Sequence, residues 1–172
     1  MRDALASFPT GVVIATAWHA ETGALGMTMN SFTSVSLQPP LIMFSIDRRA
    51  ASLPAWLHAA GYAVNVLASD QEHLSNRFAR ARTSKWEGVK FAHGLYDAPL
   101  LDAALACFEC SSYRQFDGGD HVIFLGRVER FTCNVAASPL VFHRGRYSTV
   151  AARPEAMPQA ALPAGWPLSI HY

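Results

Sequence analysis

The chain has 172 residues and a formal net charge of +1, and 51% of its residues are hydrophobic while 16% are charged. This length fits one domain with a single sizeable core, and the small net charge excludes a general nucleic-acid or membrane-surface role, which needs a strong basic field. No apolar run approaches the roughly 18 residues of a membrane-spanning helix, and the N-terminus lacks the apolar segment of a signal peptide. We therefore expect a cytoplasmic protein without a membrane or nucleic-acid partner.

Short apolar runs rich in β-branched residues predict strands in the first half of the chain. A turn at Glu21-Thr22-Gly23 separates the first two runs. The third run begins only after Pro39-Pro40, because proline cannot donate to a sheet ladder. The predicted strands are 11–18, 24–30, 41–46 and 62–67.

Brief helices are expected around these strands, the first over residues 2–7. Ser52 is predicted to cap a second helix, which Gly61 stops. Ser69 and Glu72 lie three positions apart and form a capping box, so a third helix should begin there.

Two hairpins are predicted in the second half of the chain. The sequence Asp117-Gly118-Gly119-Asp120 is a strong turn signal, and Gly145 lies in a second tight bend. Short strands therefore predominate, which favours an antiparallel β-barrel or sandwich over a wound α/β sheet. The strands of the two hairpins are 104–116 with 120–131, and 140–143 with 147–150.

Three cysteines are present, and Cys107 and Cys110 have the spacing of a CxxC motif. The segment 106–113 has the pattern of a strand, on which residues three apart point to opposite faces. The pair therefore cannot meet, and no second CxxC or histidine pair completes a metal site. We expect neither redox chemistry nor metal binding here.

We assign residues 1–150 to one domain and 151–172 to a proline-rich C-terminal tail. The prolines exclude regular structure in the tail, which we expect to lie across a partner subunit or over the site, with Trp166 as an anchor. The charged content is below the ~25% typical of soluble domains. This favours an extra apolar face buried in an oligomer, with a well-filled core as the alternative.

Residues 28–36 carry five side-chain hydroxyls and one amide, directly before an apolar run. Burying so many polar groups without partners would be costly, so the stretch favours a site for a flat, polar-edged heterocycle that bears a phosphate. A basic segment follows later in the chain. Its cations would either grip that phosphate or suit the C-terminal end of a solvated helix. They are Arg77, Arg80, Arg82, Lys85 and Lys90.

Other nucleotide and hydrolase signatures are absent from the sequence. There is no glycine-rich dinucleotide motif, no Walker motif and no nucleophile elbow. No close pair of carboxylates indicates glycosidase chemistry.

Taken together and in order, several segments make the chain similar to the short-chain flavin reductases, a family with an FMN-binding split barrel. The similarity covers about Phe8 to Val150 and rests on motifs that are weak singly and specific jointly. These are 8–13, 26–36, Pro39-Pro40-Leu41, 63–67, 71–79, Glu109-Cys110, 119–128, 139–142 and Gly145-Arg146-Tyr147.

The resemblance implies a mainly β fold, a homodimeric Greek-key antiparallel split β-barrel with a few short helices and with flavin at the dimer interface. It also implies an enzyme that uses NADH or NADPH to reduce FMN or FAD, often for a partner flavin-dependent monooxygenase. One alternative is a flavoprotein that holds FMN tightly and reduces another acceptor, such as a corrinoid. The other is a non-catalytic flavin-binding module. The sequence does not choose between NADH and NADPH or between FMN and FAD.

The resemblance also implies roles for individual residues. Backbone amides of the 28–31 segment would bond the carbonyl edge of the flavin, and His121 would orient the nicotinamide without transferring a proton. Tyr147 is equally compatible with a core aromatic, and Asn65 is expected to satisfy local backbone. The implied flavin-binding residues are Thr28, Met29, Asn30, Ser31, Ser45, Ile46, Asp47, Ser52, Phe78, Lys85 and Tyr147.

Overall fold

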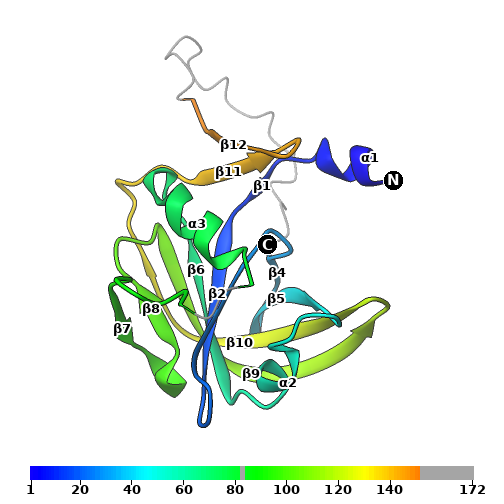
Figure 1. Cartoon of the computed structure of the whole chain (residues 1–172), viewed down its shortest axis with the longest axis vertical. Coiled ribbons are helices and arrows are strands. Elements are labelled where there is room, and N and C mark those ends of the chain that lie inside the picture. The colour runs from blue at the N-terminus through cyan, green and yellow to red at the C-terminus, as the bar shows by residue number, and fades with distance from the viewer. Residues whose placement is uncertain (82–83, 152–172) are drawn as a thin grey trace, which may run out of the picture.

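The computed structural model describes residues 1–81 and 84–151. The expectations for Arg82 and for the proline-rich tail with Trp166 therefore lie outside the described residues. Within them, the main sheet has seven antiparallel strands in the order β3-β2-β6-β9-β10-β5-β4. A small sheet, β1-β11-β12, lies at one end of the molecule, beside the N-terminal helix (Figure 1).

The strands follow the predicted runs closely, because these runs combine local β propensity with turn residues. The main-sheet strands are β2 (Val13–His19), β3 (Gly23–Met29), β4 (Thr33–Leu37), β5 (Pro40–Asp47), β6 (Gly61–Val66), β9 (Ala106–Gly118) and β10 (His121–Cys133). The others are β1 (Thr10–Gly11), β7 (Phe91–His93), β8 (Pro99–Leu101), β11 (Leu140–His143) and β12 (Arg146–Thr149). The helices are α1 (Arg2–Ala6), α2 (Leu53–Leu57) and α3 (Glu72–Phe78), with 3-10 turns at Ser69–Gln71 and Leu95–Asp97.

The order of the strands is a Greek key. Strands β6, β9 and β10 are neighbours in succession, and β5, which precedes them in the chain, pairs with β10. One core cluster takes side chains from β2, β3, β5, β6, β9 and β10, so the sheet curls around a common interior. At its centre Phe44 stacks on Phe124, with centroids 5.3 Å apart, and Tyr62 and Trp56 pack against them. The mainly β, antiparallel fold class is confirmed.

Two predictions of helix boundaries are wrong. The capping box is not made by Ser69 and Glu72: the side-chain oxygen of Gln71 accepts the N–H of Ala68 at 3.0 Å instead, and its amide donates to the carbonyl of Asp102 at 2.8 Å. Gly61 does not stop α2 either. It opens β6, where a Cβ would overlap the ring of Tyr96.

Strands β4, β7 and β8 were not predicted from the sequence. The serine-rich segment of β4 pairs with β5, and the short β7 and β8 pair with each other. By contrast, the turn before β10 and the bend before β12 are confirmed, with φ of +76° at both Gly119 and Gly145. Glycine suits these positions because it adopts positive φ without steric cost.

Both cysteines of the CxxC motif lie on a strand, as predicted, and they face opposite sides of the sheet. Cys110 belongs to the main core, while Cys107 packs with Ala63 and Ala98 in a separate cluster. Burial raises the pKa of each thiol to about 12. Neither thiol is therefore ionised near neutral pH.

Asn65 satisfies backbone groups in the core, as expected. Its amide nitrogen donates to the carbonyl of Ile14 at 3.1 Å, and its oxygen accepts the N–H of Leu101 at 2.8 Å. The variant Asn65→Leu should lower the free energy of unfolding by about 2 kcal/mol, since it leaves buried backbone groups unpaired. Urea denaturation tests this, with the exposed Asn134→Leu as the matched control. Equal stability losses in the two variants would contradict the assignment.

Candidate functional site

A groove runs along β3, which is a free edge of the main sheet. It has a volume of about 610 Å³, within the ~300–1,000 Å³ of small-molecule sites. We call it the β3 groove. Its walls come from β3, from the turn after β5, and from the end of α3 with the segment that follows. Among the residues that line it are Gly26, Thr28, Ser52, Phe78, Arg80, Lys85 and Trp86.

The backbone of β3 presents its polar groups to this groove. Trp86 Nε1 donates to the carbonyl of Ala24 at 2.8 Å, and Lys85 Nζ donates to that of Gly26 at 3.3 Å. Alternate residues of a strand direct their backbone groups to the same edge. The N–H and C=O of Thr28 therefore also point to the free edge, as hydrogen-bonding groups for a flat ligand.

Two aromatic rings cover the middle of β3. Phe78 is fully buried, and its ring meets that of Trp86 edge to face with centroids 4.8 Å apart. A Cβ on Gly26 would lie 2.5 Å from Phe78 and 2.9 Å from Trp86. Glycine at this position thus lets both rings reach the strand. Trp86 was not among the predicted site residues, because nothing in the local sequence pattern shows which ring will pack on β3.

Lys85 and Ser52 both line the groove. Lys85 Nζ also donates to the carbonyl of Phe78 at 3.2 Å, which leaves one of its three N–H groups for a ligand. Burial lowers the pKa of Lys85. Ser52 occupies the cap position of α2, as predicted, but its side chain makes no capping hydrogen bond. Its hydroxyl is therefore available to a ligand.

A smaller hollow of about 200 Å³ adjoins the groove and shares Thr28 and Ala79 with it. Three further predicted residues line it, namely Met29, Asn30 and Tyr147. The Tyr147 hydroxyl lies 2.8 Å from that of Ser75, and Thr28 Oγ1 donates to the Ser75 carbonyl at 2.7 Å. These bonds join β3, α3 and β12, so the groove and the hollow form one surface.

Of the remaining predicted residues, all but Ile46 form a row along the outer face of β5 and β10, namely Ser31, Ser45, Asp47 and His121. Ser31 Oγ accepts the N–H of Ser45 at 3.0 Å, which ties the end of β3 to β5. Asp47 follows Ser45 on the same face, directly opposite His121 on β10. Ile46 faces the core and is 1% exposed, so its side chain cannot contact a ligand.

Asp47 and His121 are both held by polar contacts with neighbouring residues. Asp47 accepts the backbone N–H of Arg49 at 2.8 Å and its guanidinium at 2.7 Å, and these bonds hold the pKa of the carboxyl well below its usual range. His121 Nδ1 lies 2.7 Å from Asp120 Oδ1, with the imidazole partly exposed. Arg48 Nε donates to the Gly119 carbonyl at 2.8 Å, which links Arg48 to the turn between β9 and β10.

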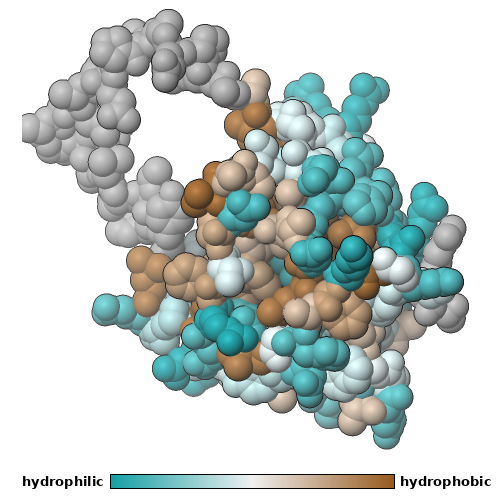
Figure 2. All heavy atoms as spheres, turned by 90° about the vertical axis from the view of Figure 1, so that its left-hand side faces the viewer, coloured by the Kyte–Doolittle hydropathy of each residue, from teal (hydrophilic) through white to brown (hydrophobic). Residues whose placement is uncertain are grey.

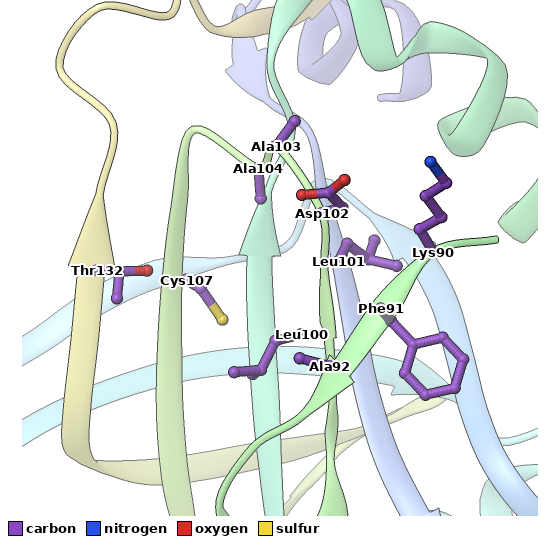
Figure 3. Close-up of a pocket in the computed structure, with 10 residues that line it drawn as sticks. All are labelled: Lys90, Phe91, Ala92, Leu100, Leu101, Asp102, Ala103, Ala104, Cys107 and Thr132. Carbon is purple, nitrogen blue, oxygen red and sulfur yellow. The ribbon is translucent and has the colours of Figure 1, made fainter.

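A separate hollow of about 500 Å³ shares no lining residue with the groove. Figure 3 shows it among β7, β8 and β9, with Cys107, Asp102 and Lys90 in its wall. It lies toward the side of the molecule seen in Figure 2, where apolar residues gather in a band with polar ones around it. It contains no predicted site residue apart from Lys90 of the basic segment, and its thiol is protonated near neutral pH.

Residues 1–81 and 84–151 offer neither a cluster of metal ligands nor a membrane-spanning helix. No cluster of three or more potential metal ligands occurs in this range. In the same range, no helix has the length and apolar character needed to cross a bilayer.

Comparisons with known proteins identify relatives over nearly the whole described chain. The reductase component of the flavin-dependent trigonelline monooxygenase of Acinetobacter baylyi is 39% identical over 151 residues, which cover 88% of this chain and 48% of that protein. The FMN reductase (NADH) SmoA of Agrobacterium fabrum is 38% identical over 146 residues, covering 85% and 82%. The chain spans about half the length of the first two curated relatives it matches.

A solved structure agrees with these relatives. The NADH:FAD oxidoreductase SgcE6 of Streptomyces globisporus superposes with a TM-score of 0.84 at 36% identity, covering 89% of this chain and 92% of that one. The same protein in complex with NAD and FAD fragments gives a TM-score of 0.83. The family model "Flavin reductase like domain" matches residues 5–151. The chain therefore belongs to the flavin reductase like domain family, as its sequence motifs indicate.

Proposed function

We propose that this protein is an NAD(P)H-dependent flavin reductase that binds FMN or FAD in the β3 groove and supplies reduced flavin to a partner monooxygenase. The observation that carries the proposal is the open groove on the free edge of β3. A flat ring with a polar edge fits the backbone groups at Thr28, and a phosphate fits Ser52 and Lys85, which line the same groove. The names of the relatives support the same activity.

The residues present are suited to binding and orientation. A bound flavin supplies the hydride acceptor, and the reaction then needs two stacked rings at the correct distance instead of a strong acid or base from the protein. We infer that the row from Ser31 to His121 borders the nicotinamide, with His121 as a positioning residue. A homodimer, in which a second chain completes the site, belongs to the same proposal.

Steady-state kinetics tests the activity directly. Oxidation of NADH and NADPH should be sustained in the presence of free FMN or FAD, and the flavin should separate from the protein on gel filtration. A yellow colour that survives filtration, with slow turnover of free flavin, would instead favour a flavoprotein that reduces another acceptor. No oxidation of either nicotinamide with any flavin would favour a binding module.

The role of His121 has its own test. His121→Ala should raise the KM for NADH by roughly tenfold, the effect of losing about one hydrogen bond, and change the KM for flavin less than twofold. The exposed His73→Ala, on α3, is the matched control and should change neither constant. If His121→Ala raised both constants equally, the imidazole would not be a nicotinamide-positioning group.

A further inference from the structure

The β3 groove continues past Ser52 into a second hollow of about 580 Å³, which we call the His58 hollow. The two spaces share Leu25, Ala51 and Ser52. The His58 hollow lies between the β2–β3 turn and α2. Its further lining residues are His19, Glu21, Thr22, Pro54, Ala55 and His58. A ligand with a phosphate at Ser52 therefore has a path onward beyond it.

The lining of the His58 hollow combines an apolar surface with polar groups. Leu25, Pro54 and Ala55 offer apolar contact, which suits a flat base. His58 Nδ1 lies 2.8 Å from the Pro54 carbonyl. Because a carbonyl only accepts, Nδ1 carries the proton, and Nε2 of the neutral ring is left as an acceptor.

One further group in the hollow is available for polar contact. Glu21 is exposed on the β2–β3 turn, where its carboxylate can accept hydrogen bonds from a diol. Apolar contact for a base, an acceptor for an amino group and a carboxylate for a ribose are together the features of an adenosine site.

We propose that the His58 hollow holds the adenosine half of FAD, so that this chain binds FAD more tightly than FMN. This inference rests on the proposed function. FMN ends at its single phosphate and leaves the hollow to water, whereas FAD continues through a pyrophosphate at Ser52. Adenosine could also come from the nicotinamide dinucleotide, but the hollow shares Leu25, Ala51 and Ser52 with the β3 groove, where the flavin is proposed to bind. His121, the candidate nicotinamide residue, lies on β10 and does not line it.

Binding of FAD and FMN, measured separately by isothermal titration calorimetry, tests the proposal. The native chain should bind FAD roughly tenfold more tightly than FMN, or about 1.4 kcal/mol. Thr22→Trp, on the exposed turn, should fill the hollow and weaken FAD binding about tenfold while FMN binding stays within about twofold. Ala20→Trp places the same side chain on the same turn outside the hollow and should affect neither flavin.

Other outcomes would overturn the inference. Equal weakening of FAD and FMN by Thr22→Trp would mean that the hollow is not specific to adenosine. A higher KM for NADH, with both flavins unaffected, would assign it to the nicotinamide dinucleotide. If Thr22→Trp fails to fold, His58→Ala gives the second comparison and should weaken FAD alone. The titrations need no turnover, so a chain that failed to oxidise NADH would contradict the proposed function while leaving the comparison of FAD with FMN intact.

Discussion

Replacing Arg130 by Met is expected to lower the free energy of unfolding more than replacing Glu109 by Gln does, because it leaves the desolvated carboxylate of Glu109 without its charged partner. Glu109 lies on β9 with its side chain only 3% exposed. Arg130 donates to both of its oxygens, at 2.5 and 2.7 Å, and the N–H of Leu95 donates to one of them at 2.7 Å. Without the guanidinium, a buried carboxylate is left with one neutral donor.

Replacing the other partner, Glu109, should lower the free energy of unfolding by less. In Glu109→Gln the half-exposed Arg130 keeps its water, and the new amide oxygen still accepts the Leu95 N–H, so we expect a loss of about 1–2 kcal/mol. Urea denaturation at pH 7 measures both variants. Equal losses, or a larger loss for Glu109→Gln, would contradict the assignment of Glu109 as the desolvated partner.

The pH dependence of the Arg130→Met effect follows from Glu109. Hydrogen bonds from Arg130 lower the pKa of Glu109 below its ordinary value of 4.5. A lowered folded-state pKa contributes stability above the ordinary value and loses it as the pH falls through the folded one. In Arg130→Met this contribution is absent. The stability difference between the native chain and the variant should therefore be constant near pH 7 and shrink below about pH 4.5.

The regions predicted correctly are those whose signals are local. The β9–β10 hairpin follows from a glycine turn between two apolar runs, and φ is positive at Gly119 as such a turn requires. Strand β4 has no such signal, because its serines and threonine pair with β5 only through tertiary contact. The capping box predicted at Ser69 and Glu72 is wrong for the same reason, because a tertiary contact decides the local structure. The side chain of Gln71 bridges Ala68 and Asp102, thirty-one residues further on, and a local motif cannot contain that contact.

The residues of the candidate site also divide into those with a local sequence signal and those that depend on tertiary contacts. The polar stretch at Thr28 indicated a ligand, and the free edge of β3 explains it physically. Individual residues such as Ser52 and Lys85 came from the family resemblance, and the structure brings both to one groove. What sequence could not supply is the shape of the groove. The packing of Trp86 on Gly26 and the passage from Ser52 to His58 depend on segments that only the fold brings together.

Lys85 gives the largest expected effect on ligand binding. Lys85→Met should weaken FMN binding by about 30- to 100-fold, since a charged hydrogen bond to a phosphate contributes roughly 2–3 kcal/mol in a partly buried site. Riboflavin has the same ring and no phosphate, so its binding should change less than about threefold. Calorimetric titration with both flavins makes the comparison. Lys90→Met, exposed and outside the groove, is the matched control and should bind both normally.

The protonation of Lys85 provides an independent check. Burial lowers its pKa from the ordinary 10.5, so the ammonium group loses its proton at a lower pH than an ordinary lysine does. The preference for FMN over riboflavin should accordingly decline as the pH rises toward 10.5, and this decline should be absent in Lys85→Met. Lys85→Arg, which keeps its charge at every pH in this range, should retain part of the preference without the decline. Equal loss of FMN and riboflavin in Lys85→Met would instead mean that the side chain only supports the groove, through its bonds to the carbonyls of Gly26 and Phe78.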